Sequence, residues 1–178
     1  MEYLRLSWSD IEAQCKQIAS EIRGKKLEFD VIVGLARGGW IPTRLLSDYL
    51  DIDELHTVRV KFYRGVGQHL EKPLILHPTQ FDIQGKRVLL VDDIADTGES
   101  LIATLEHLKE KSSDRVFVVT LVKKPHSKFT PDIYAKETSA WVVFPWEVKE
   151  TINSIKQKGL KELEKANISK DEYDSFMF

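Results

Sequence analysis

The residues best suited to chemistry lie in one stretch, Val88–Ser100, which reads VLLVDDIADTGES. An apolar run typical of a buried strand ends in two adjacent acids, Asp92 and Asp93, and a short turn then leads into a helical pattern. Neighbouring carboxylates suit ribose hydroxyls or a hard cation such as Mg²⁺. The turn offers backbone N–H groups, hydroxyls and a helix N-terminus, which together suit a phosphate. This stretch therefore predicts a site for a phosphorylated sugar.

The Asp-Thr-Gly at positions 96–98 is by itself a common helix cap, and no Gly-Lys-Ser/Thr follows it, so the turn is not a Walker-type loop. The complete string is more specific, because it resembles the signature of the type I phosphoribosyltransferases, which bind phosphoribosyl pyrophosphate (PRPP). The resemblance implies that the 5′-phosphate is bound by five consecutive residues, Asp96, Thr97, Gly98, Glu99 and Ser100. It also implies that Asp92 and Asp93 hold the ribose hydroxyls, directly or through water on Mg²⁺, and that Asp96 is a general acid/base near purine N7.

A second glycine-rich turn, Gly34–Gly39 (GLARGG), follows another apolar run. Its glycines permit a close backbone approach, and Arg37 carries a guanidinium group suited to an anion. A plain turn with an exposed arginine is the alternative. In the resembled family this position is the pyrophosphate-binding loop, which implies PRPP contacts from Arg37 and Gly38, catalytic help from Arg37, and a cis peptide between Ala36 and Arg37.

The polar stretch Tyr63–Pro73 contains two glycines and charges of both signs, which predicts a mobile loop. By resemblance this is the catalytic loop that closes over PRPP and excludes water. Lys61 then lies at the base of the loop as a catalytic residue. Arg64 or His69 would reach the pyrophosphate on closure, or else stay in solvent.

The later part of the chain resembles the base-binding segment of xanthine–guanine and hypoxanthine–guanine phosphoribosyltransferases. Lys124-Pro125 follows an apolar run, and Trp141-Val142-Val143-Phe144-Pro145-Trp146-Glu147 comes 17 positions later. The resemblance implies that Trp141 stacks on the purine, that Lys124 donates to its O6 and that the backbone near Val142 meets the other edge. Glu147 would join Asp92 and Asp93 as a metal ligand. The alternatives are core tryptophans and solvated Lys123 and Lys124.

Strands and helices alternate along the chain, and this order has to position these groups. An apolar run predicts a strand at 31–35, and strand-like stretches predict further strands at 55–62, 87–91 and 116–122. Helical spacing predicts helices at 11–22, 42–49, 98–110 and from 148, the first with a near capping box of Ser7 and Asp10. This order predicts an α/β fold, specifically the type I phosphoribosyltransferase fold with a central, mainly parallel sheet flanked by helices. The resemblance adds a small hood from the terminal segments.

Residues 1–155 are expected to form the phosphoribosyltransferase domain, with a PRPP core and a purine-binding hood. Residues 156–178 are expected to be a C-terminal extension of unknown role, with charges balanced as in a solvated segment. The extension would pack at a subunit interface, since a homodimer or homotetramer is the usual form.

The 178-residue chain has a net charge of −2 and one cysteine, Cys15. This composition excludes an intrachain disulfide and disfavours nucleic acid and membrane partners. Cys15 lies on the apolar side of a predicted helix, which indicates a buried thiol. The first ten residues do not read as a signal peptide, so the expected location is the cytoplasm.

These features predict a purine phosphoribosyltransferase that uses Mg²⁺ and PRPP. It would join the phosphoribosyl group to N9 of guanine, hypoxanthine or xanthine in purine salvage, forming the nucleotide and pyrophosphate. An adenine enzyme on the same scaffold is one alternative. A regulator that senses PRPP without catalysis is the alternative from another class, although no added DNA-binding segment is recognisable.

Overall fold

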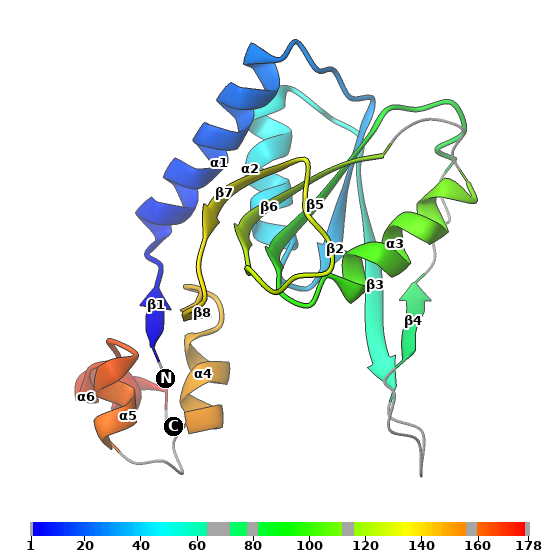
Figure 1. Cartoon of the computed structure of the whole chain (residues 1–178). Coiled ribbons are helices and arrows are strands. Elements are labelled where there is room, and N and C mark those ends of the chain that lie inside the picture. The colour runs from blue at the N-terminus through cyan, green and yellow to red at the C-terminus, as the bar shows by residue number, and fades with distance from the viewer. Residues whose placement is uncertain (1, 64–71, 78–81, 112–115, 156–159, 177–178) are drawn as a thin grey trace. The chain divides into compact units, whose positions relative to one another are not determined.

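The chain forms two compact units, one of residues 12–138 and one that combines residues 1–11 with residues 139–178. The structure is a computed structural model and describes residues 2–63, 72–77, 82–111, 116–155 and 160–176. The first unit is called the sheet unit and the second the terminal unit below (Figure 1).

The sheet unit is built on a six-stranded sheet with the order β4-β3-β2-β5-β6-β7. Its strands are β2 (Val31–Ala36), β3 (Leu55–Tyr63), β4 (Lys72–His77), β5 (Val88–Ala95), β6 (Val116–Lys123) and β7 (Ile133–Glu137). All neighbouring strands pair in parallel except β3 and β4. The central strands β2 and β5 are almost completely buried, which explains their unbroken apolar runs.

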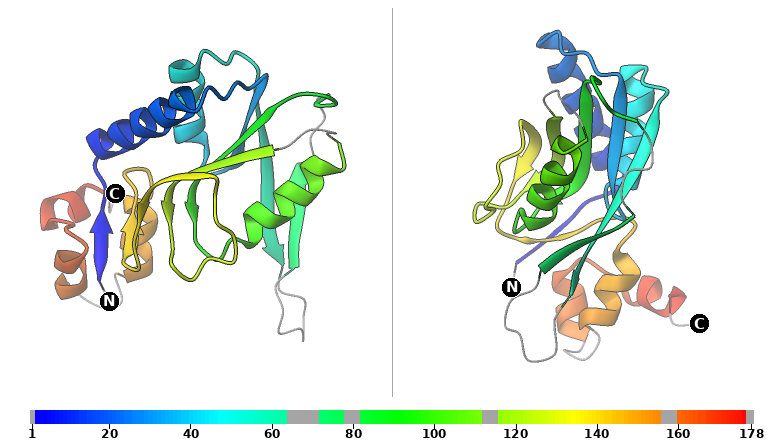
Figure 2. Two further views of the ribbon diagram at one scale, coloured as in Figure 1. Left: turned by 45° about the horizontal axis from the view of Figure 1, so that its top comes forward. Right: turned by 90° about the vertical axis from the view of Figure 1, so that its right-hand side faces the viewer.

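Helices α2 (Trp40–Leu50) and α3 (Glu99–Lys109) connect parallel strands of this sheet. The chain moves from β2 to β3 in one direction along the sheet and from β5 to β6 in the opposite direction. Because such crossovers are right-handed, α2 and α3 cover opposite faces, as Figure 2 shows. The predicted mainly parallel α/β fold is confirmed.

Apolar side chains of the sheet and α3 form the core on the α3 face. Val33, Leu35 and Leu90 of the central strands pack with Leu101 and Leu108 of the helix, and all five are at most 3% exposed. Burial of such side chains stabilises the fold by roughly 1.5–3 kcal/mol each. This packing holds the ends of β2 and β5 in place, and both of those ends carry predicted site residues.

Helix α1 (Trp8–Gly24) begins in the terminal unit and continues into the sheet unit. Its start has the predicted capping box: the Ser7 backbone N–H donates to Asp10 Oδ2 (2.7 Å), and the Asp10 N–H donates to Ser7 Oγ (3.2 Å). Cys15 is fully buried on this helix, as expected, and burial raises the pKa of its thiol to about 12.

The terminal unit contains a parallel pair of short strands and three helices. Its elements are β1 (Tyr3–Arg5), β8 (Trp141–Val143), α4 (Val148–Ile155), α5 (Leu160–Lys165) and α6 (Lys170–Ser175). Residues from both ends of the chain therefore form one unit, as the expected hood of terminal segments requires.

The C-terminal segment is not a wholly solvated tail. Leu163, Ala166 and Ile168 are buried in a cluster with Val143 and Ile152. The Arg5 guanidinium also donates to the Glu172 carboxylate and to the Asn167 carbonyl. The sequence pattern was misleading here because a few apolar residues are spaced among many charged ones.

Two strands of the sheet, β4 and β7, were not predicted. Strand β4 includes Pro73, a residue restricted in sheets to edges and strand starts, and β7 is a short edge strand with charged residues. Both ends of the predicted loop, Tyr63 and Pro73, belong to strands. Residues 64–71, including Arg64 and His69, lie outside the described residues. Among the described helices, none combines the length and hydropathy needed to cross a bilayer.

Candidate active site

The candidate site lies where the strand order reverses, between β2 and β5. Parallel strands of an open α/β sheet leave a crevice at such a point, beyond their carboxyl ends. Arg37 directly follows β2. Asp92 and Asp93 lie in the second half of β5, toward its carboxyl end. The register pairs Gly34 with Val91, so the carboxyl ends of strands β2 and β5 lie side by side.

A pocket of about 350 Å³ opens at the end of β5. Its lining consists of the predicted phosphate and ribose residues with two apolar neighbours: Asp92, Asp93, Ile94, Asp96, Thr97, Gly98, Glu99, Ser100 and Leu101. The predicted PRPP residues of this segment therefore surround one cavity.

One end of this pocket is the start of α3. Gly98 precedes the helix with a left-handed φ of 83°, and it has no side chain to cap the first N–H groups. Asp96 and Thr97 are exposed in the turn before it. Backbone N–H groups at a helix start are a favourable site for an anion, so the geometry suits the predicted 5′-phosphate.

The turn that carries Arg37 has the predicted backbone feature, a cis peptide between Ala36 and Arg37. Gly38 lies against the carboxylate of Asp93, and Gly39 is the N-cap residue of α2. The close approach of the two turns explains why glycines follow Arg37.

Side-chain hydrogen bonds attach the start of α2 to the sheet. The Trp40 indole N–H donates to Thr57 Oγ1 (2.9 Å), and that hydroxyl donates to the Gly34 carbonyl (3.0 Å). Trp40 is nevertheless 51% exposed. The loop containing Arg37 is therefore held between β2 and a helix start that is bound to β3.

The two acids of β5 suit the predicted magnesium ion. Asp92 is 9% exposed and Asp93 is 5% exposed, and Asp92 Oδ1 accepts the backbone N–H of Asp93 (2.9 Å). In the described part of the chain, no group of three or more His, Cys, Asp or Glu side chains forms a metal cluster. Mg²⁺ often binds through one or two carboxylates, with water and substrate phosphates completing its shell, so two acids fit this ion.

Lys61 lies on the part of β3 that extends beyond the end of β2. The β2 pairing ends at Arg59, and Lys61 pairs instead with Leu74 of β4. Its side chain is exposed. Lys61 is thus at the same edge of the sheet as the pocket and next to the region expected to be a loop.

Lys124 is buried, in contrast to the solvated alternative. It is 6% exposed, and its backbone N–H donates to the carbonyl of Ala95 (2.9 Å), the last residue of β5. Burial lowers the pKa of the Lys124 ammonium, while the charge of Asp96 acts in the opposite direction. The electrostatic contact with Asp96 connects this lysine to the pocket.

Lys123 is also buried, but it has a structural partner. Its Nζ lies 2.9 Å from Glu137 Oε2 and 5.6 Å from the centre of the Tyr134 ring, and both residues are in β7. Lys123 therefore attaches β6 to β7, and of the two lysines Lys124 is the one near the pocket.

Trp141, Val142 and Glu147 belong to the terminal unit, whereas Lys124 belongs to the sheet unit. Trp141 begins β8 and is 50% exposed, while Val142 is buried. Glu147 donates its backbone N–H to the Phe144 carbonyl (3.0 Å). Phe144 and Trp146 stack with their ring centres 4.9 Å apart, so Trp146 packs against an aromatic neighbour within the unit. The meeting of Trp141 and Val142 with Lys124 at one base stays a prediction.

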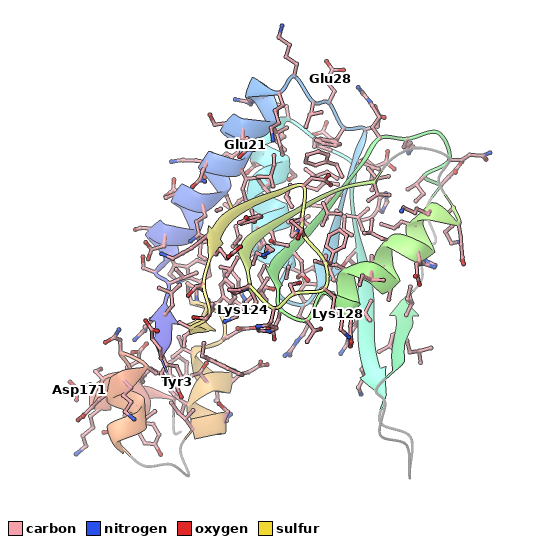
Figure 3. All side chains as sticks on the ribbon, in the orientation of Figure 1. Tyr3, Glu21, Glu28, Lys124, Lys128 and Asp171 are labelled. Atoms are coloured by element: carbon pink, nitrogen blue, oxygen red, sulfur yellow. The ribbon has the colours of Figure 1, made fainter. Side chains whose placement is uncertain are left out.

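Sequence reasoning missed the segment after Lys124. His126 Nε2 lies 3.1 Å from Asp96 Oδ1, and Lys128 Nζ lies 2.6 Å from Glu99 Oε1. Figure 3 labels Lys124 and Lys128 at the two ends of this segment. The only sequence signal was the clustering of basic residues in KKPHSK, which does not reveal that they face the acids of a distant turn.

Comparison with known proteins agrees with this geometry. Residues 6–152 match the model of the phosphoribosyl transferase domain. The chain belongs to this family. The match contains the Arg37 loop, the segment from Asp92 to Ser100, and Lys124.

Known phosphoribosyltransferases are similar over most of the chain. The xanthine-guanine phosphoribosyltransferase of Chromohalobacter salexigens is 31% identical over 149 residues, which is 80% of this chain and 83% of that protein. The crystal structure of a purine phosphoribosyltransferase from Pyrococcus horikoshii has a TM-score of 0.74 and 38% identity, covering 82% of this chain and 94% of that one. A xanthine-guanine-hypoxanthine phosphoribosyltransferase of Helicobacter pylori has a TM-score of 0.72 and 26% identity, covering 87% and 99%.

Proposed function

We propose that this phosphoribosyltransferase transfers the phosphoribosyl group of PRPP to N9 of a 6-oxopurine, which is guanine, hypoxanthine or xanthine. The observation that supports this most is the pocket at the end of β5, which is lined by every residue of Asp92–Ser100 except Ala95. The buried Lys124 is attached to this segment through the Ala95 carbonyl. The relatives named for xanthine-guanine and purine substrates favour the same substrate class.

The proposed reaction exchanges one bond at C1 of the ribose for another. The purine N9–C1 bond forms, the C1–oxygen bond breaks, and pyrophosphate leaves with the electron pair. The proton that the purine carries at N7 passes to the Asp96 carboxylate. Arg37 and the amides of its loop stabilise the growing negative charge on pyrophosphate. Lys61, at the same edge of the sheet, is the third proposed catalytic residue.

Asp92 and Asp93 would hold Mg²⁺ together with the ribose hydroxyls and pyrophosphate oxygens of PRPP. The ion would supply positive charge that favours departure of pyrophosphate. Glu147 was predicted as a third ligand. Two carboxylates already fit the ion, and Glu147 belongs to the other compact unit, so its ligation stays a prediction.

The buried Lys124 favours a 6-oxopurine over adenine. O6 of guanine, hypoxanthine or xanthine accepts a hydrogen bond, whereas the 6-amino group of adenine donates one. A buried ammonium facing an amino group would lose its partner, and such a loss is costly. Trp141 would stack on the ring, with the Val142 backbone at the opposite edge of the base.

The test is pyrophosphate release from PRPP and Mg²⁺ with guanine, hypoxanthine, xanthine or adenine supplied separately. Turnover of at least one 6-oxopurine, lost on addition of EDTA and restored by excess Mg²⁺, is the expected result. Turnover of adenine alone would contradict the role of Lys124. PRPP binding without turnover of any base would instead support a PRPP-sensing regulator.

A symmetric homodimer or homotetramer is also part of this proposal, and sedimentation of the full chain tests it. Residues 156–178 would contribute to such an interface. A monomer at micromolar concentration would contradict both statements.

A further inference from the structure

The segment between β6 and β7 is attached to the phosphate turn at two points. The Lys124 N–H donates to the Ala95 carbonyl (2.9 Å), and the Lys128 N–H donates to the Thr97 carbonyl (3.0 Å). These carbonyls lie on either side of Asp96. The segment from Lys124 to Lys128 therefore runs alongside the residue proposed to accept the purine proton.

Contacts at Gly98 keep the two segments close together. A Cβ atom on this glycine would lie 2.7 Å from the Phe129 backbone nitrogen and 2.9 Å from Ser127 Oγ. The Ser127 hydroxyl itself donates to the Phe129 carbonyl (2.9 Å). The segment is thus held against the turn that carries Asp96 and Gly98, both of which line the pocket.

His126 lies in the middle of the segment from Lys124 to Lys128, and its ring is directed at Asp96. Its Nε2 is 3.1 Å from Asp96 Oδ1, and the two side chains are 64% and 59% exposed. The Lys128 ammonium pairs with Glu99, so it is occupied by a different acid. Among the described residues, the polar groups found to act on Asp96 are the His126 ring, at hydrogen-bond distance, and the Lys124 ammonium, through the electrostatic contact described above.

We propose that His126 is a positioning residue for Asp96. The inference rests on the proposed function, in which Asp96 accepts the N7 proton of the purine. With the proton of a neutral imidazole on Nε2, His126 donates to Asp96 Oδ1 and limits rotation of the carboxylate. Asp96 Oδ2 is then the oxygen presented to the purine. Holding a reacting group in one orientation contributes directly to rate.

Kinetics of two His126 variants provide the first test. His126→Ala removes the donor, whereas His126→Gln retains an N–H group. Because exposed pairs contribute little, we expect His126→Ala to lower kcat by about two- to fivefold, with an unchanged KM for PRPP. His126→Gln should recover most of the loss.

His56→Ala is the matched control. His56 Nε2 also lies 3.1 Å from a carboxylate, Glu54 Oε1, but this pair is at the start of β3, away from the carboxyl edge of the sheet. We expect kcat of this variant to stay within about 1.5-fold of wild type, since the partly buried pair does not border the pocket and Glu54 keeps Lys86 as a partner. Equal kcat in His126→Ala, His126→Gln and wild type would overturn the proposal, as would an equal loss in His56→Ala.

Nitrogen-15 NMR of the histidine rings tests the contact without any turnover. Where the ring signals are those of a neutral imidazole, His126 should carry its proton on Nε2. Asp96→Asn should shift the His126 ring resonances and leave those of His56 unchanged. A proton on Nδ1, or no shift in Asp96→Asn, would overturn the pairing. If the wild-type chain turns over no base, the proposed function and the kinetic role both fail, while the NMR result still decides whether the pair exists.

Discussion

Gly38 lies so close to Asp93 that a Cβ atom at position 38 would come within 1.9 Å of Asp93 Oδ2. Gly38 lies in the turn after β2, and Asp93 lies in strand β5. The turn proposed to bind pyrophosphate and the acid proposed for ribose and Mg²⁺ are therefore packed directly against each other. A glycine at position 38 is a condition for both groups to occupy their places.

Gly38→Ala should lower kcat/KM for PRPP by at least about tenfold. The added methyl group would displace the Asp93 carboxylate, and a displacement of about 1 Å in a catalytic site can cost about 100-fold. Gly24→Ala is the matched control, because a Cβ atom at Gly24 would have no neighbour within 4 Å. Steady-state kinetics with varied PRPP provide the measurement, and equal values for both variants would contradict the packing explanation.

Lys124→Met should change the choice of base. Loss of a hydrogen bond from a charged group costs about 1.5–3 kcal/mol, so kcat/KM for the 6-oxopurine should fall by about ten- to hundredfold. Adenine turnover should fall much less, because it gains nothing from the ammonium.

The control for this prediction is Lys123→Met. Lys123 is buried beside Lys124 but pairs with Glu137. We expect this variant to melt at a lower temperature while it keeps the wild-type ratio of guanine to adenine turnover. A changed ratio in Lys123→Met, or an unchanged ratio in Lys124→Met, would contradict the assignment of Lys124 to the base.

Cys15 should resist thiol reagents in the folded protein. Its thiol has a pKa raised to about 12 by burial, and the side chain is fully buried. At pH 8 the thiolate fraction is then on the order of 10⁻⁴, so labelling should be at least about 100-fold slower than in the unfolded chain. Mass spectrometry after timed labelling measures this ratio. Rapid labelling under native conditions would show that α1 opens easily.

The same pKa shift predicts lower stability at high pH. The unfolded thiol loses its proton near its ordinary value of 9.0, whereas the folded thiol keeps it until about pH 12. Between these values the folded state holds more protons, so the free energy of unfolding falls as pH rises. Cys15→Ala should remove this contribution, and urea denaturation at pH 8, 9 and 10 compares the two slopes.

Leu163→Ala should destabilise the terminal unit. Leu163 is 3% exposed in the cluster with Val143 and Ile152, and truncation of a buried leucine costs about 2–5 kcal/mol. Hydrogen exchange should become faster in β1 and β8 and change less in β5 and β6, which belong to the other unit. The exposed Glu164→Ala is the control in the same helix, and wild-type exchange in Leu163→Ala would contradict a packed C-terminal segment.

The sequence by itself determined the main features of the sheet unit. Apolar runs located β2, β5 and β6, because strands buried on both faces need continuous apolar residues, and a strand-like stretch located β3. The acids and glycines after these runs located the residues proposed to bind PRPP, since ligands of open α/β sheets lie at the carboxyl ends of strands. The edge strands β4 and β7 were missed because an edge strand is only partly buried and does not need a continuous apolar run. In β7, for example, only Ile133 is buried.

Only the tertiary structure decided which groups face one another across distant segments. The approach of Gly38 to Asp93, the burial of Lys124 in place of solvation, and the pairing of His126 with Asp96 all join residues more than 25 positions apart. The C-terminal segment was misjudged for the same reason, since Leu163 and Ile168 become buried only when Val143 and Ile152 are beside them. Periodicity records which side of an element is apolar, but partners across the fold are selected by strand order and packing.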